Sequence, residues 1–433
     1  MEHTTSLELI DFIAGSPSPF HAADRVRGML EREGYLPLRE SEPWRVKAGG
    51  RYYVTRNGSS LIAFRVPQGR WRGFLLSASH SDSPTFQIKE HGELEGPEGY
   101  LRVNTERYGG MLCAPWLDRP LSVAGRALVR VAGGVESRLV NIDRDLMMIP
   151  NVAIHMNREV NNGYPYDPKT DMVPLLGMSG EQGVLRALVA EAAGVREEDL
   201  LGTDLFLYLR QQGTIWGAGR EFLSAPRLDD LQCAFGCLKG FLAAETEGES
   251  LPVYCLFDNE EVGSGTRQGA DSDFLQRTLE RLCAALEKEY PVAVANSFLV
   301  SADNAHAVHP NHPEYADPTH RPHLNGGVVI KHSASQRYTT DAVSQAVFSE
   351  VCRRAGVPVQ HFANRSDLAG GSTLGNIALA HVSLHSVDIG LPQLAMHSPY
   401  ETAGVKDTDF LIRAMAVYYA ASFSVEEDGH CSF

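Results

Sequence analysis

Four short apolar runs, each followed by acidic or histidine residues, most limit what this chain can fold into. The runs and their endings are residues 74–78 before Ser79-His80-Ser81-Asp82, residues 251–257 before Asp258-Asn259-Glu260-Glu261, residues 297–302 before Asp303, and residues 382–387 before Asp388. Apolar runs of this length predict buried strands. Polar residues at the ends of such strands are typical of an open α/β sheet, in which the loops at the strand ends form a crevice.

Segments with helical periodicity lie between and after these runs. Apolar residues recur every three to four positions in residues 231–244, 274–288, 341–355 and 407–421. Strands that alternate with helices predict a sheet whose two faces are covered by helices. The fold class that we expect is therefore α/β.

Residues 92–226 have a different character. They contain few helix signals and many β-forming residues in short pieces, such as residues 121–131 and 136–140, which Gly133-Gly134 separates. One helix is predicted near residues 181–193. We therefore expect residues 92–226 to form a β-rich domain that is inserted into an α/β domain made of residues 1–91 and 227–433.

Length and charge exclude several classes of protein. A chain of 433 residues has room for two or three domains. The net charge of −15 disfavours nucleic acid and anionic membrane surfaces as partners. No signal-peptide pattern or membrane-length apolar run is found, so we expect a cytoplasmic protein. The seven cysteines include no Cys-x-x-Cys pair, which favours reduced thiols over a disulfide framework.

Several residues at the predicted strand ends could hold a metal ion. His80 alone is weak evidence, but Asp82 two residues later could orient its ring while the other ring nitrogen binds a metal. Asp229 precedes a helix and could simply be its N-cap, yet Asp229 and Asp230 together are more than one cap needs. Glu260 and Glu261 would point in opposite directions on extended backbone, unless they belong to a solvated acidic loop.

Asp303 and His397 complete a set of nitrogen and oxygen ligands. With His80, Asp229 and Glu261 they make two histidines and three carboxylates, a set that suits zinc or a similar divalent ion. One bridging carboxylate with two further ligands for each ion would make a two-metal site. Nucleotide binding and serine hydrolysis are poorer interpretations, because the glycine-rich residues 263–269 match no phosphate-binding motif and no Gly-x-Ser-x-Gly is present.

The order of these motifs along the chain resembles the aspartyl aminopeptidase family of di-zinc exopeptidases. The motifs are His-x-Asp, Arg-Leu-Asp, Asp-x-Glu-Glu-Val-Gly-Ser, Ser-x-Asp-x-Ala-His and Met-His-Ser. Further similar segments are Ile154-His155, Lys331, Arg337-Tyr338, Gly370-Gly371-Ser372-Thr373 and Val387-Asp388-Ile389-Gly390. The resemblance implies a three-layer α/β/α exopeptidase domain, an inserted β-rich dimerisation domain and a dodecamer built from dimers.

The resemblance also implies roles for individual residues. One zinc would be held by His80, Asp229 and Asp303, and a second by Asp229, Glu261 and His397. Glu260 would be the general base, and Asp82 would orient His80. Substrate would be contacted by Lys331, Tyr338, Gly371, Ser372 and Thr373, and His155 would reach a neighbouring subunit's active site. Relatives commonly have Asn where this chain has Asp230, so the extra charge would alter metal affinity.

The implied activity is removal of N-terminal residues from peptides, with a preference for Asp or Glu that Lys331 would provide. A preference for neutral residues stays open. Two other interpretations also stay open: a related di-zinc amidohydrolase such as a deacylase or carboxypeptidase, and a non-catalytic metal-bound scaffold or cargo protein. The scaffold is disfavoured by Glu260, since a closed structural zinc site needs no spare base.

Overall fold

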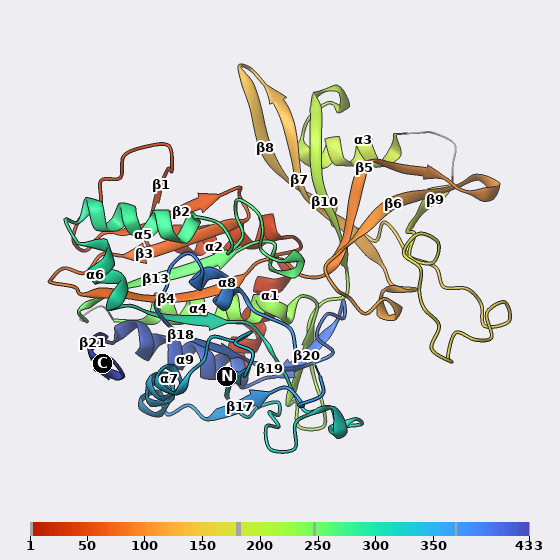
Figure 1. Cartoon of the computed structure of the whole chain (residues 1–433). Coiled ribbons are helices and arrows are strands. Elements are labelled where there is room, and N and C mark those ends of the chain that lie inside the picture. Colours follow the sequence, from red (N-terminus) through yellow and green to blue (C-terminus); the bar gives the residue numbers. More distant parts are fainter. Residues whose placement is uncertain (1–2, 179–182, 246–247, 369, 433) are drawn as a thin grey trace.

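The computed structural model describes residues 3–178, 183–245, 248–368 and 370–432, and a nine-stranded mixed sheet forms its centre (Figure 1). In sheet order the strands are β1 (Leu36–Leu38), β2 (Arg51–Arg56), β3 (Ser60–Arg65), β13 (Ser250–Phe257), β4 (Gly73–His80), β14 (Phe298–Ala302), β18 (His385–Gly390), β16 (Val328–His332) and β17 (Val359–Ala363). The four central strands β13, β4, β14 and β18 run parallel. Their carboxyl ends therefore meet at one edge of the sheet.

Helices cover both faces of this sheet. One face packs against α1 (Thr4–Ala14), α2 (Pro19–Arg32), α4 (Leu228–Ala243), α7 (Ala342–Ala355) and α9 (Asp407–Ala420), and the other against α5 (Phe274–Ala285), α6 (Tyr290–Ala295) and α8 (Leu374–Leu379). Along β4, Leu75 faces the first core while Phe74 and Leu76 face the second, as the period of two in a strand requires. The expected α/β fold with three layers is confirmed.

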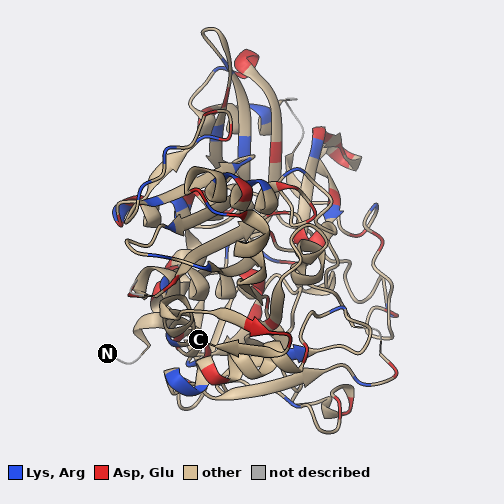
Figure 2. Cartoon of the chain, turned by 60° about the vertical axis from the view of Figure 1, so that its left-hand side comes forward, with Lys and Arg blue, Asp and Glu red and all other residues tan. Residues whose placement is uncertain are grey.

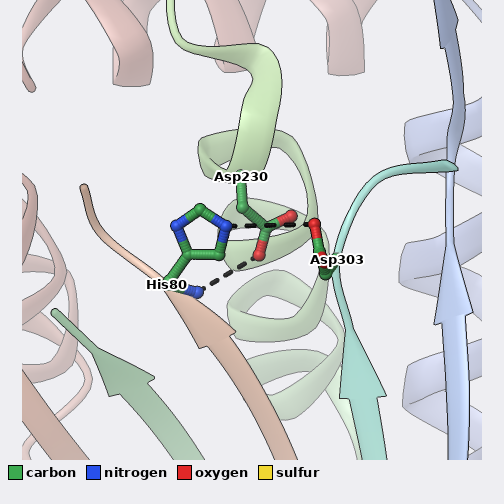
Figure 3. Close-up of side chains that lie close together, drawn as sticks. All are labelled: His80, Asp230 and Asp303. Atoms are coloured by element: carbon green, nitrogen blue, oxygen red, sulfur yellow. Dashed lines mark hydrogen bonds and ion pairs between the residues drawn. The ribbon is translucent and has the colours of Figure 1, made fainter. Parts of the chain in front are cut away.

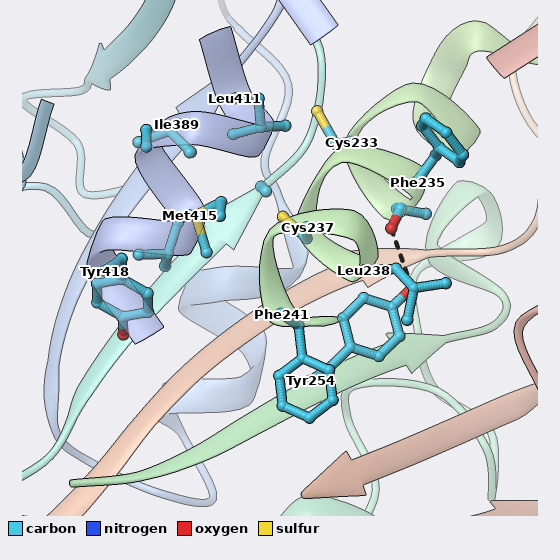
Figure 4. Close-up of a cluster of buried hydrophobic side chains, with 14 of the residues drawn as sticks. Cys233, Phe235, Cys237, Leu238, Phe241, Tyr254, Ile389, Leu411, Met415 and Tyr418 are labelled. Carbon is cyan, nitrogen blue, oxygen red and sulfur yellow. Dashed lines mark hydrogen bonds between the residues drawn. The ribbon is translucent and has the colours of Figure 1, made fainter. Parts of the chain in front are cut away.

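Small residues let α4 and α9 approach closely at the centre of the larger core (Figure 4). A Cβ atom added to Gly240 would lie 2.5 Å from the Cβ of Met415, so this contact admits only glycine. The buried hydroxyl of Tyr254 donates a hydrogen bond to the carbonyl of Ala234 at 3.2 Å. This packing holds the start of α4 firmly against the sheet.

The predicted helices and most predicted strands agree with the structure to within a few residues, but one strand was placed wrongly. The strand predicted at residues 382–387 is β18, which begins at His385 and continues to Gly390. Its register is set by pairing with β14 on one side and β16 on the other, which the apolar run alone does not reveal. Asp388 therefore lies within the strand and does not follow it.

A second sheet of six antiparallel strands lies outside the three layers (Figure 1). In sheet order its strands are β8 (Gly134–Asn141), β7 (Leu121–Val131), β10 (Leu200–Leu209), β5 (Thr85–Glu95), β6 (Tyr100–Tyr108) and β9 (Leu175–Met178). Helix α3 (Val184–Ala193) packs on it around a separate core. Residues 181 and 182 of the helix predicted there lie outside the described residues.

A third sheet joins residues from both parts of the chain. Its strands are β11 (Thr214–Trp216), β12 (Phe222–Ala225), β20 (Glu401–Gly404), β19 (Pro392–Leu394) and β15 (Ala305–His306), and a separate hairpin is formed by β21 (Ser424–Glu427) and β22 (His430–Ser432). The second sheet is formed by strands within residues 85–209, whereas β11 pairs with β12 and β12 pairs with β20 near the C-terminus. The domain division at residues 92–226 stays a prediction. Among the described helices, none has both the length and the apolar character that a membrane span requires.

Candidate metal centre

The predicted ligands come together at the carboxyl ends of the central parallel strands. His80 is the last residue of β4, Glu261 lies in the turn after β13, and Asp303 follows β14. Asp229 lies at the start of α4, and His397 lies between β19 and β20. Five residues that are far apart in sequence therefore lie together at one edge of the sheet, as expected for the open edge of an α/β sheet.

Asp229 lies between two groups of these side chains. Its Oδ1 atom is 3.8 Å from His80 Nε2, and its Oδ2 atom is 3.3 Å from His397 Nε2. His80 Nε2 also lies 3.9 Å from Asp303 Oδ1, and His397 Nε2 lies 3.4 Å from Glu261 Oε2. The two oxygens of one carboxylate thus face two separate clusters, each with one histidine and one further carboxylate.

Asp230 also takes part in the first cluster, beside His80 and Asp303 (Figure 3). Its Oδ2 atom accepts a hydrogen bond from the backbone N–H of His80 at 3.2 Å. One possible ligand atom from each of these three residues lies within 4.8 Å of the other two. The additional aspartate of this chain therefore lies directly at the candidate metal centre.

The carboxylate of Asp82 is fully enclosed by donors. It accepts hydrogen bonds from the hydroxyl of Tyr108 at 2.7 Å and from the backbone N–H groups of Glu260 and Glu261 at 3.2 and 3.1 Å. Its Oδ1 atom lies 3.3 Å from His80 Nδ1, which leaves His80 Nε2 to face Asp229 and Asp303. Asp82 therefore fixes both the ring of His80 and the backbone that carries the two glutamates.

Lys331 lies on the other side of Asp303. Its Nζ atom is 3.3 Å from Asp303 Oδ2, and its side chain is 3% exposed. The ammonium group lies 5.4 Å from the centre of the ring of Tyr338. Burial alone would lower the pKa of Lys331, but Asp303 and the other acidic groups around it raise this pKa above its ordinary value. Lys331 is therefore a buried cation at the edge of the cluster.

Burial and mutual repulsion strongly disturb the carboxylates of the centre. Burial, together with the charges of its acidic neighbours, raises the pKa of Glu260 to about 7. The same causes raise the pKa values of Asp230 and Glu261 well above their ordinary range. Asp303 behaves differently: burial opposes its ionisation, but Lys331 and His80 lower its pKa. Acidic and basic residues are interspersed over the rest of the chain (Figure 2), so this cluster is distinguished by its burial.

Unpartnered buried oxygens show that the residues present fit metal ions. Asp229 Oδ1, Asp230 Oδ1 and Glu261 Oε1 are buried and have no hydrogen-bond partner. A buried carboxylate oxygen without a partner costs folding free energy. A bound divalent cation would supply the missing partner and would reduce the repulsion between neighbouring anions. Imidazole and carboxylate ligands suit zinc.

The residues expected to contact substrate occupy different environments. Gly371 and Ser372 are exposed, whereas Thr373 is buried and donates a hydrogen bond to Asp388 Oδ1 at 2.6 Å. Gly371 lines a cavity of about 550 Å³ that His306 and Arg365 also line. Thr373 therefore fastens its loop to β18, and Gly371 of the same loop faces the cavity.

His155 lies apart from this centre. It is exposed, in the segment between β8 and β9, and it makes none of the contacts described for the carboxylate cluster. Its neighbours Val152, Ile154 and Met156 expose 48%, 48% and 85% of their surface. Its predicted role in a neighbouring subunit stays a prediction.

Sequence reasoning did not identify Glu401 and Tyr108 as residues of this centre. Glu401 is buried and accepts hydrogen bonds from the backbone N–H groups of Asp229 at 3.0 Å and His397 at 2.8 Å. Burial and the charge of Asp229 raise the pKa of Glu401 to about 8. Its position four residues after His397 was the one available signal. Tyr108 comes from β6 in the second sheet, and no local pattern marked it.

Comparison with known proteins gives one consistent result. The family model described as aminopeptidase I zinc metalloprotease (M18) matches residues 12–419. A protein of Clostridium acetobutylicum named probable M18 family aminopeptidase 2 is 44% identical over 423 residues, which is 95% of this chain and 98% of that protein.

Solved structures agree with this result. A chain in the cryo-EM structure of the Ape4 and Nbr1 complex has a TM-score of 0.92 and 34% identity, covering 96% of this chain and 85% of that one. The S. cerevesiae mApe1 dodecamer has a TM-score of 0.85 and 30% identity, covering 96% of each chain.

Proposed function

The chain belongs to the M18 family of zinc metalloproteases and is an aminopeptidase, and from this premise we propose that its carboxylate cluster holds two zinc ions that Asp229 bridges. The observation that carries the proposal is the position of Asp229, whose two carboxylate oxygens face different histidines at 3.8 and 3.3 Å. His80 and Asp303 would complete one site, and Glu261 and His397 the other. Asp230 lies close enough to the first site to supply a further carboxylate.

Glu260 is the proposed general base. When bound, zinc supplies Lewis acidity toward the scissile carbonyl and lowers the pKa of a water ligand. Glu260 takes a proton from the attacking water and returns it to the departing amine. Its backbone N–H donates a hydrogen bond to Asp82 Oδ1 at 3.2 Å, and one of its carboxylate oxygens lies within 4.8 Å of possible ligand atoms of His80 and Glu261. Asp82 acts through His80 and the backbone, and it does not touch substrate.

The substrate that we propose is a peptide whose first residue is Asp or Glu. Lys331 supports this preference because it is the buried cation beside the cluster. Arg365 also lines the adjoining cavity, although it is paired with Asp367 at 2.6 Å. An acidic side chain would therefore meet a more favourable potential here than a neutral one.

A panel of aminoacyl anilides tests this function. The enzyme is expected to cleave anilides with a free amino group, to leave N-acetylated ones intact, and to have a higher kcat/KM for Asp and Glu than for Leu. Cleavage of blocked substrates would identify a deacylase, and release of C-terminal residues from peptides would identify a carboxypeptidase. A preference for Leu over both acids would refute the acidic specificity.

The variant Glu260→Gln separates catalysis from metal binding. We expect it to keep the wild-type zinc content and to lose about 10²- to 10⁴-fold in kcat, the usual contribution of general acid–base catalysis. Glu191→Gln, on the exposed surface of α3, is the matched control and should keep full activity. Wild-type turnover by Glu260→Gln would remove Glu260 from its role as general base.

We also propose that the chain forms a homo-oligomer through its second sheet. The related mApe1 structure is a dodecamer. In this chain, the exposed apolar side chains of Val152, Ile154 and Met156 gather in one segment, as is typical of an interaction surface. Light scattering should give a mass of twelve subunits for the wild type and a smaller species for the double variant Ile154→Asp, Met156→Asp. A wild-type monomer would refute this proposal.

A further inference from the structure

Three histidines gather near one edge of the central sheet, outside the carboxylate cluster. His332 is the last residue of β16, His361 lies in the neighbouring strand β17, and His320 lies in the segment before β16. His332 Nε2 and His361 Nδ1 are 3.0 Å apart, and their rings are stacked with centres 5.2 Å apart. The ring centre of His320 lies 6.5 Å from that of His332.

The first two histidines point to the side of the sheet opposite to Lys331. His361 pairs with Ile330 in the parallel register, and Lys331 pairs with Phe362. Side chains alternate along a strand, so His332 shares a face with Ile330 and His361, while Lys331 shares the other with Phe362. Ile330 belongs to the core that includes α7 and α9. These imidazoles are therefore separate from the metal centre that Lys331 adjoins.

The mechanism proposed above uses none of these three rings, yet they have the chemistry of metal ligands. Burial and the neighbouring imidazoles lower the pKa values of His332 and His361, so both are neutral at pH 7. His320 Nδ1 lies 2.9 Å from Asp317 Oδ1. A carboxylate at one ring nitrogen fixes the tautomer of a histidine and leaves its other nitrogen for a metal.

We propose that His320, His332 and His361 form an additional site for a divalent transition metal such as zinc, with Asp317 as the residue that orients His320. His332 Nε2 and His361 Nδ1 are joined by a hydrogen bond at 3.0 Å, and two nitrogens bound to tetrahedral zinc at about 2.1 Å are about 3.4 Å apart, so the ion would replace this hydrogen bond with a small separation of the two nitrogens. The three nitrogens do not all lie within 4.8 Å of one another in the structure. The side chain of His320 is 39% exposed and lines the cavity of about 550 Å³, and it would turn toward the other two rings to complete the site.

Zinc titration of the holoenzyme tests this site. Protein that has been loaded with zinc and freed of excess metal is titrated calorimetrically with zinc, and its metal content is measured at a series of buffered free zinc concentrations. The wild type should take up one more ion per chain than the double variant His332→Asn, His361→Asn. Because the comparison is a difference of one ion between the two proteins, it does not depend on how many ions the catalytic centre holds.

Two further variants make the test specific. Asp317→Asn should weaken the additional site by about 10- to 100-fold and leave the catalytic centre loaded. His312→Asn removes a nearby exposed histidine, whose Nδ1 atom lies 2.9 Å from Glu314, and should leave the additional ion in place. His320→Asn changes only a partly exposed side chain, so it replaces the double variant in the titration if that variant does not fold, and it should also lose the additional ion. A wild type that takes up no additional ion, or an additional ion retained without His332 and His361, would overturn the proposal.

Discussion

Replacement of Asp82 by Asn should weaken zinc binding although Asp82 is not itself a proposed zinc ligand. The two carboxylate oxygens of Asp82 accept three hydrogen bonds, from the hydroxyl of Tyr108 and the backbone N–H groups of Glu260 and Glu261, and Oδ1 also faces His80 Nδ1. Asparagine has the same shape but only one accepting oxygen. With the amide N–H₂ group in place of Oδ2, the hydroxyl of Tyr108 and the N–H of Glu261 lose their acceptor. With it in place of Oδ1, the N–H of Glu260 loses its acceptor, while His80 Nδ1 keeps the backbone carbonyl of residue 82 at 3.1 Å.

The size of the effect follows from these contacts. Loss of a carboxylate that orients a histidine ligand lowers metal affinity by about 10- to 100-fold, which is ~1.4–2.7 kcal/mol of binding free energy. Buried donors without an acceptor cost about 1–3 kcal/mol each, so the metal-free protein should also lose free energy of unfolding. Asp82 is buried, so water cannot accept the hydrogen bonds that its carboxylate accepts in the wild type.

Competition with a zinc chelator measures the affinity, and denaturant unfolding of the metal-free protein measures the stability. Asp407→Asn is the matched control, because Asp407 is also buried and accepts backbone N–H groups of Asn325 and Gly327. It should lose stability and keep its zinc affinity. Zinc affinity of Asp82→Asn within about twofold of the wild type would refute the reasoning.

Three further predictions concern specificity, pH dependence and the core. Lys331→Met should lower the ratio of kcat/KM for Asp-anilide to that for Leu-anilide by at least about tenfold, ~1.4 kcal/mol. An unchanged ratio would show that Lys331 does not provide the acidic preference. Burial lowers the pKa of His21 from 6.5 to about 4. Below pH 6.5 the unfolded chain binds this proton and the folded chain does not, so His21 removes up to ~3 kcal/mol of stability between pH 6.5 and pH 4. His21→Gln should flatten that part of the stability profile in urea unfolding, and the same slope as the wild type would contradict the assignment. Phe241→Ala should cost ~3–5 kcal/mol in unfolding experiments, because Phe241 is fully buried against Tyr254 and Tyr419, and a loss below ~1 kcal/mol would show that the core closes around the gap.

The positions of the residues at the strand ends could be predicted from the sequence. His80 ends an apolar strand, Glu261 and Asp303 follow two others, and parallel strands bring their carboxyl ends to one edge. Asp229 and His397 lie outside the parallel strands; the ligand chemistry of the sequence included them in the set, but the assignment of Asp229 as the bridge depended on resemblance to a family. Roles for all five residues stay predictions until metal binding is measured.

The supporting residues could not be predicted, because most of their partners are distant in sequence. Glu401 accepts backbone N–H groups from residues 172 and 4 positions away, and Tyr108 reaches Asp82 from a different sheet. No local pattern carries such information. The misplaced strand β18 has the same cause, since its register depends on pairing with β14 and β16.

Anomalous diffraction at the zinc absorption edge, from crystals of the loaded enzyme, tests the central claim most directly. The account predicts two peaks about 3.5–4 Å apart, one on each side of Asp229, with His80 beside the first and His397 beside the second. A single peak among these residues, or zinc held without Asp229, would contradict it.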